Sequence, residues 1–306
     1  MKLLPIALLG GLALHATTFC VTVAGLGGEP EYEQRFSTLA QELDKLLKPM
    51  PNFDVQTLYG PRATKANLTA ALQQVAKEAK ADDALVLMMI GHGGYDGLDY
   101  KINLPGPDLS AVELAALLDR IPTTRQLVVN MTSASGGSRA ALEKPSRVVI
   151  TATKSGNEKN ATIFARYWVD ALRDPSADTD KNEAITALEA FRFAEEKTAK
   201  FYDTQKRLAT EHPTLEDTGK GDGARAPSAE NGEGLLAARF TLVRIGSAQT
   251  AAATPEKQAL VAHREDVEQQ IERLKYQKAA MPPDEYKKQL GALLLDLAKT
   301  QAEIDK

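Results

Sequence analysis

Long apolar runs without alternating polar residues are the feature of this 306-residue chain that most limits its fold. The segments 84–90 (ALVLMMI) and 126–131 (QLVVNM) are apolar almost throughout. A strand that is apolar on both faces is buried on both faces, as in a parallel sheet with helices on each side. Segments with helical spacing separate these runs, so the sequence predicts an α/β fold in three layers.

The elements of this fold can be assigned by residue range. We expect a mostly parallel six-stranded sheet from strands at 18–24, 53–58, 84–90, 126–131, 147–152 and 239–245. Helical periodicity predicts helices at 31–48, 64–80, 110–121 and 161–172. The stretch 219–234 is rich in glycine and alanine, which indicates a loop before the last strand.

The two ends of the chain differ from this central part. Residues 1–16 carry one lysine, an apolar run and then small residues, which is typical of a secretory signal peptide. The α/β domain then covers 17–246, and 247–255 is a linker. Residues 256–306 predict a helical hairpin broken at Pro282–Pro283, with a coiled-coil-like seam that serves packing or a protein partner.

Composition excludes some classes of function. The net charge is −4 and no basic stripe is present, so nucleic-acid binding is not expected. Cys20 is the only cysteine, so the chain cannot form an internal disulfide. No segment after the leader is apolar enough to span a membrane, and we expect a periplasmic or secreted protein.

Two polar groups follow neighbouring apolar strands. His92 comes directly after the strand at 84–90, and Ser133 follows the strand at 126–131. Parallel neighbours lie about 4.8 Å apart, so both side chains are expected in the crevice at the carboxyl edge of the sheet. The backbone N–H groups of Gly93 and Ser133 would then form an oxyanion hole.

These motifs resemble those of the caspase- and legumain-like cysteine peptidases of clan CD. In that family one strand ends in His-Gly and a later strand ends in C-x-S-G; His92–Gly93 and the SASG segment starting at Ser133 match these positions. The resemblance covers 17–245 and implies a caspase-like three-layer sandwich acting on peptides or proteins. It also implies a substrate-pocket loop that includes Thr153, Lys154, Ser155 and Glu158.

Ser133 stands where the family has its catalytic cysteine. A thiol with a pKa near 8.5 ionises readily beside a histidine, whereas an alcohol needs a general base to remove its proton. The sequence offers no obvious carboxylate to orient His92. We therefore expect weak activity or a lost active site, and the alternative is a non-catalytic binding or scaffold protein on the same fold.

A second alternative is an α/β-hydrolase-type serine esterase or peptidase. GHGG at Gly91–Gly94 resembles an oxyanion loop, and SASGG resembles a nucleophile elbow centred on Ser135. Asp178 or Asp180 and then His212 follow in the order that this class requires.

The segment 178–189 (DTDKNEAITALE) has the spacing of an EF-hand loop. Its ligands for Ca²⁺, the only cofactor we expect, would be Asp178, Asp180, Asn182, the Ala184 carbonyl and Glu189. Glu183 stands where glycine normally takes a positive φ, which costs roughly 1–2 kcal/mol. The alternative is an acidic loop in which Asp180 or Asn182 caps a helix that begins near Ala184.

Overall fold

The structure is a computed structural model that describes residues 16–221, 223–246 and 255–306. The predicted signal peptide, apart from its last residue, and nearly all of the predicted linker lie outside the described residues.

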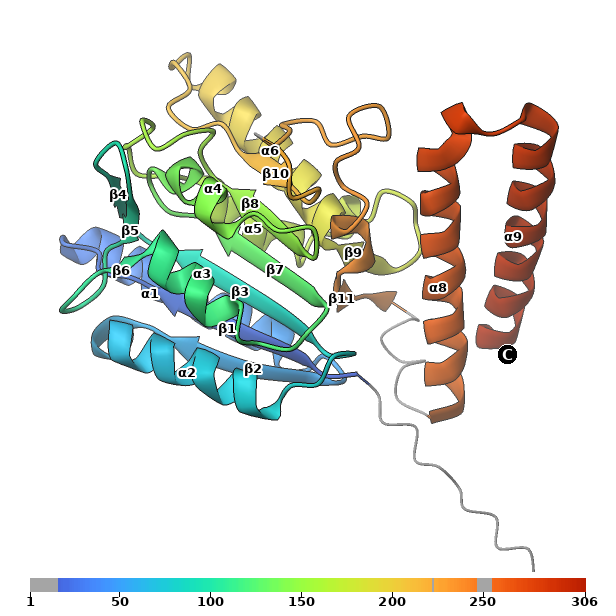
Figure 1. The fold of residues 1–306 in the computed structure, drawn as a ribbon, viewed down its shortest axis with the longest axis horizontal. Helices are drawn as coiled ribbons and strands as arrows, with labels where there is room; N and C mark the ends of the chain where they lie inside the picture. Colours follow the sequence, from blue (N-terminus) through green and yellow to red (C-terminus); the bar gives the residue numbers. More distant parts are fainter. Residues whose placement is uncertain (1–15, 222, 247–254) are drawn as a thin grey trace, which may run out of the picture.

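The centre of the molecule is a six-stranded sheet with five parallel strands and one antiparallel edge strand (Figure 1). Its strands, in spatial order, are β10 (Thr214–Glu216), β8 (Arg147–Thr151), β7 (Arg125–Asn130), β3 (Ala84–Ile90), β1 (Thr18–Ala24) and β2 (Phe53–Leu58). All seven residues of β3 are buried, as expected of a central strand with covered faces.

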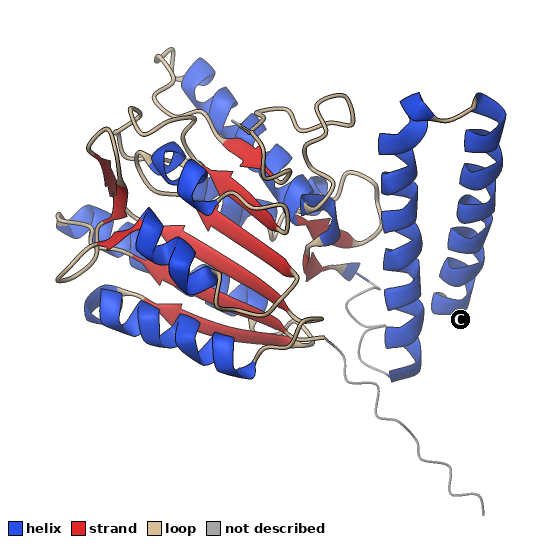
Figure 2. Ribbon diagram, in the orientation of Figure 1, coloured by secondary structure: helices blue, strands red, loops and turns tan. Residues whose placement is uncertain are grey.

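Helices cover both faces of this sheet (Figure 2). One face carries α1 (Pro30–Leu47), α5 (Phe164–Ala171) and α6 (Ala187–Thr204), and their buried side chains share a core with the strands. The other carries α2 (Lys65–Glu78), α3 (Ala111–Leu118) and α4 (Arg139–Leu142). The predicted three-layer α/β class with a mostly parallel six-stranded sheet is confirmed.

The sixth strand of that sheet is not the one predicted at 239–245. β11 (Thr241–Arg244) instead pairs with β9 (Ala184–Thr186) in a separate two-stranded sheet. The edge position belongs to β10, which has only three residues. Its place depends on tertiary contacts, such as the hydrogen bond between the hydroxyls of Thr214 and Thr151.

A small sheet stands at the carboxyl edge of the main one. It consists of β4 (Gly93–Tyr95), β5 (Tyr100–Ile102) and β6 (Leu109–Ser110), and it begins directly after His92. Asp96 accepts hydrogen bonds from the N–H groups of Leu98 and Asp99, so it closes the turn between β4 and β5.

The C-terminal hairpin is confirmed as a pair of helices, α8 (Pro255–Gln277) and α9 (Pro283–Ile304) (Figure 1). Val267, Ile271 and Leu274 of α8 are buried, whereas Tyr286, Leu290, Leu293 and Leu297 of α9 are half-buried. The side chains of Arg244 and Glu265 form an ion pair that joins β11 to α8. Across the described ranges, no helix has the length and apolar character needed to cross a bilayer.

Candidate functional site

The parallel pairing of β3 with β7 brings His92 and Ser133 together. Met89 and Asn130 are partners in the register, so the chain leaves both strands at the same edge. Nδ1 of His92 lies 3.4 Å from Oγ of Ser133. Ser133 is only 2% exposed, so this residue is buried at the carboxyl edge of the sheet.

Gly93 is the reason the two strand ends can approach so closely. A Cβ atom at Gly93 would lie 2.7 Å from the carbonyl oxygen of Ser133 and 2.6 Å from the ring of Tyr100. No side chain fits in this gap. The hydroxyl of Tyr100 also hydrogen-bonds to Thr132, which fixes the backbone just before Ser133.

The turn after Ser133 is held in a sterically unfavourable conformation. Ala134 has a φ of 55°, in the left-handed region that residues with a Cβ rarely adopt. Its N–H donates to the carbonyl of Glu158 at 2.8 Å. Strain of this kind persists only where the surrounding contacts enforce it, and it is frequent at functional sites.

The surroundings of His92 favour its neutral form. Burial lowers the pKa of His92 below its usual 6.5, and the nearby Arg35 guanidinium acts in the same direction. A hydrogen bond to the backbone of Gly27 partly opposes these effects. The rings of Tyr32 and Phe36 pack edge-on against the imidazole at 4.8 and 5.1 Å between centroids. These contacts orient the ring, and the nearby Glu29 carboxylate acts on it only through its charge, which raises the pKa.

The contacts of α1 with His92 were not predicted from sequence. Tyr32 and Phe36 are four residues apart and therefore lie on one face of the helix. Their spacing was visible, but the position of His92 beside that face depends on where α1 packs. The hydrogen bond from His92 to Gly27 involves the backbone of Gly27, so no residue type in the sequence indicates it.

The four predicted pocket residues have different environments. Thr153 is buried, and its hydroxyl accepts from the N–H of Gly136. Lys154 is exposed, and Ser155 is half-buried. Glu158 is hydrogen-bonded to the imidazole of His212 and accepts a hydrogen bond from the N–H of Lys154.

Glu158 thereby joins three segments at the carboxyl edge. Its side chain holds His212, which precedes β10, and its carbonyl holds Ala134 in the turn after β7. The sequence indicated Glu158 only as a pocket wall, and its pairing with His212 was not predicted.

The pair required by the α/β-hydrolase alternative is not in contact. Ser135 is buried, and its hydroxyl bonds to the hydroxyl and N–H of Thr153. The imidazole of His212 bonds to Glu158 instead. Within the described residues, no hydrogen bond joins Ser135 to His212.

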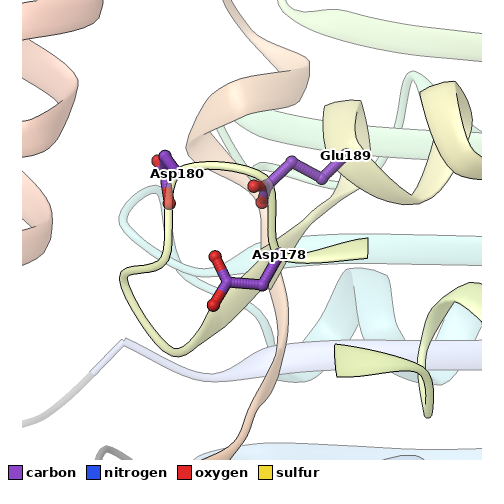
Figure 3. Close-up of side chains that lie close together, drawn as sticks. All are labelled: Asp178, Asp180 and Glu189. Carbon is purple, nitrogen blue, oxygen red and sulfur yellow. The ribbon is translucent and has the colours of Figure 1, made fainter. Parts of the chain in front are cut away.

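The 178–189 loop brings three carboxylates together at the side of the domain that faces α8. Carboxylate oxygens of Asp178, Asp180 and Glu189 all lie within 4.8 Å of one another (Figure 3). Burial and the charges of Glu189 and Asp178 raise the pKa of Asp180 to about 6. Glu183 has a φ of 62°, the conformation that the EF-hand spacing requires at this position.

The loop makes contacts within itself and one to α8, where the side-chain amide of Asn182 donates to Glu268 at 2.9 Å. Glu189 accepts hydrogen bonds from the N–H and hydroxyl groups of Thr179 and Thr186. The side-chain oxygen of Asn182 accepts from the N–H of Ala184. The predicted cap at Asp180 or Asn182 is wrong: Ala184 begins β9, and α6 begins at Ala187 with Thr186 as its cap, because Thr186 and Glu189 form a capping box.

Comparison with known proteins gives similarity only to solved structures. No family model and no curated protein matches the chain. A crystallised protein from Geobacter sulfurreducens is 14% identical over 66% of this chain and 92% of its own, with a TM-score of 0.43. Caspase-1 from Spodoptera frugiperda is 15% identical over 66% of this chain and 87% of its own, with a TM-score of 0.45.

Proposed function

We propose that this protein is a slow peptide-bond hydrolase that uses Ser133 as nucleophile and His92 as general base. The observation that carries the proposal is the 3.4 Å separation of Nδ1 of His92 from Oγ of Ser133. Catalytic hydrogen bonds are often longer without substrate and shorten in the reacting complex. The substrate would be a peptide or protein, as the clan CD resemblance implies.

The contacts of His92 support this assignment of roles. Its lowered pKa keeps the imidazole neutral at pH 7, which a general base requires. We assign the ring proton to the nitrogen that bonds to Gly27, so that Nδ1 can accept the proton of Ser133. The N–H groups of Gly93 and Ser133 are the proposed donors to the oxyanion.

The reaction then follows the acyl-enzyme course. Oγ of Ser133 attacks the peptide carbonyl carbon while its proton moves to His92, and the oxyanion forms. His92 donates that proton to the leaving amine as the C–N bond breaks. Water, deprotonated by His92, then hydrolyses the ester and restores both groups.

Replacement of Ser133 tests this function. We expect a fluorogenic peptide library to show slow cleavage by the wild type and only background cleavage by Ser133→Ala. Ser133→Cys should cleave faster than the wild type, because a thiol ionises far more easily than an alcohol. Ser135→Ala, in the same turn, is the matched control and should keep most of the wild-type rate.

The second candidate is a non-catalytic peptide-binding or scaffold protein on the same fold. It is favoured by the alcohol at position 133 and by the lack of a carboxylate hydrogen-bonded to His92 among the described residues. In that case wild type would show no cleavage while Ser133→Cys gains it. Binding of the library peptides without turnover would identify this function.

We also propose that the 178–189 loop binds Ca²⁺ as a structural ion. Three carboxylates within 4.8 Å of one another repel each other, and a divalent cation would relieve that repulsion. Asp178, Asp180 and Glu189 would supply the charged ligands, with Asn182 and the Ala184 carbonyl completing the set. Glu189 would have to exchange its contacts with Thr179 for the ion.

Calcium should therefore stabilise the protein. An EF-hand-like site in an extracellular protein has a Kd of about 10⁻⁴–10⁻³ M, so 10 mM Ca²⁺ should add about 2 kcal/mol to the free energy of unfolding. Thermal melts with Ca²⁺ and with EDTA measure this change. Asp178→Asn should abolish the increase, whereas Asp54→Asn, at an exposed position on β2, should keep it. Equal melting temperatures with Ca²⁺ and EDTA would refute the site.

The remaining parts of the proposal concern location and partners. We propose export to the periplasm or out of the cell, on the basis of the signal-peptide pattern in residues 1–16. The protein partner of the C-terminal hairpin stays a prediction.

A further inference from the structure

A cavity of about 980 Å³ lies where the C-terminal hairpin meets the α/β domain. Its walls come from the 179–189 loop, from α8 and from α9, and neither His92 nor Ser133 lines it. Its size is at the upper end of the range for sites that bind small molecules. Leucine and isoleucine side chains contribute to the wall: Leu188, Ile271, Leu294 and Leu297.

Arg264 of α8 lines this cavity with unused hydrogen-bond donors. Its side chain is buried, and Nη1 donates to Oε1 of Gln301 at 2.9 Å. Nε and Nη2 have no hydrogen-bond partner among the described residues. The carboxylate of Glu268 lies 3.7 Å from Nε, too far for a hydrogen bond. Buried polar groups are normally satisfied, so unpaired donors here call for an acceptor.

The two free donors of Arg264 are the pair on one edge of the guanidinium. This edge makes two parallel hydrogen bonds to a carboxylate in the usual fork geometry. Arg244, which is also paired with α8, shows the completed arrangement: its Nε and Nη2 donate to Glu265 at 2.8 and 3.0 Å. The same edge of Arg264 has the Glu268 carboxylate nearby but no acceptor at hydrogen-bond distance among the described residues, so it can bind a further carboxylate.

Negatively charged side chains also line the cavity. Asp180 and Glu268 both face the side-chain amide of Asn182, which donates to each of them. Seven acidic side chains line the cavity against four basic ones, Lys181, Arg192, Arg264 and Lys275, so negative charge is in excess. A ligand with only negative charge would be repelled by these acids, whereas an ammonium group would be attracted.

We propose that this cavity is a binding site for a short zwitterionic peptide with apolar side chains. The ligand carboxylate bonds to Nε and Nη2 of Arg264, its ammonium group meets Glu268, and its side chains contact Leu294 and Leu297. This site stands independently of the function proposed for Ser133.

Calorimetric titration of the full chain with leucyl-leucine tests the site. We expect saturable binding, at least tenfold weaker for the C-terminal amide of the same dipeptide and for its N-acetyl form. Arg264→Lys keeps the charge but loses the fork, and it should remove the preference for the acid over the amide. Arg273→Gln, which removes a charge from an exposed position on α8 outside the cavity, should bind as the wild type does.

Two results would overturn the proposal. One is no detectable heat with leucyl-leucine at millimolar concentration. The other is equal affinity for the acid and the amide. A thermal melt shows whether Arg264→Lys is folded. Glu268→Gln provides a second test, of the contact with the ligand's ammonium group. Glu268→Gln keeps the shape of the side chain. It should weaken the binding of leucyl-leucine but leave the binding of the N-acetyl form unchanged.

Discussion

Gly136→Ala is expected to destabilise the protein by about 3 kcal/mol, the upper part of the range for overpacked sites. A Cβ at this position would lie 2.3 Å from the backbone nitrogen of Ser155 and 2.5 Å from the carbonyl carbon of Lys154. These are backbone atoms and cannot move aside as a flexible side chain would. The turn after Ser133 and the 153–158 loop would have to separate.

Urea unfolding followed by fluorescence measures this effect as a lower midpoint with an unchanged slope. Gly94→Ala is the matched control, because a Cβ at that exposed glycine would have no atom within 4 Å. It should change the free energy of unfolding by less than about 0.5 kcal/mol. Equal midpoints for the two variants would mean that the turn after Ser133 does not pack tightly on the 153–158 loop.

The parallel core was predictable because its signal is local. The strands at 18–24 and 84–90 coincide with β1 and β3, since continuous apolar residues indicate strands buried on both faces. The strand at 53–58 coincides with β2, an edge strand in which only Leu58 is buried. The edge strand was missed for the opposite reason. Thr214–Glu216 has one apolar residue, and it becomes a strand only because β8 presents an open edge.

The meeting of His92 and Ser133 could be predicted because parallel strands that neighbour each other end at the same edge. The contacts that orient His92 could not, because they come from α1 and from the backbone of Gly27. Helix packing decides which residues lie over a strand end, and this cannot be read from periodicity. The same limit applies to Glu158 and His212, which are 54 positions apart in the chain.

Arg264 shows a third kind of limit. Its position on α8 is at helical spacing from buried residues, which suggests an ordinary boundary residue of the seam. The unpaired edge of its guanidinium is visible only in three dimensions.

His92→Ala is expected to lower kcat/KM for peptide cleavage by about 10²–10⁴, the usual contribution of a general base. The loss should fall mainly on kcat, because the imidazole acts on the proton of Ser133 rather than on binding. The double variant His92→Ala/Ser133→Ala should be no slower than Ser133→Ala, since the two groups act as a unit. Wild-type activity should fall only at a pH below 6.5, because the pKa of His92 is lowered and the protonated ring cannot accept a proton.

His212→Ala is the control that separates this mechanism from the α/β-hydrolase alternative. His212 bonds to Glu158, so its loss should loosen the pocket loop and raise KM more than it lowers kcat. If His212→Ala and Ser135→Ala abolish cleavage while His92→Ala retains it, the nucleophile is Ser135 rather than Ser133. A loss of activity on acidification that already begins above pH 6.5 would likewise contradict His92 as the base, because burial and Arg35 both lower its pKa.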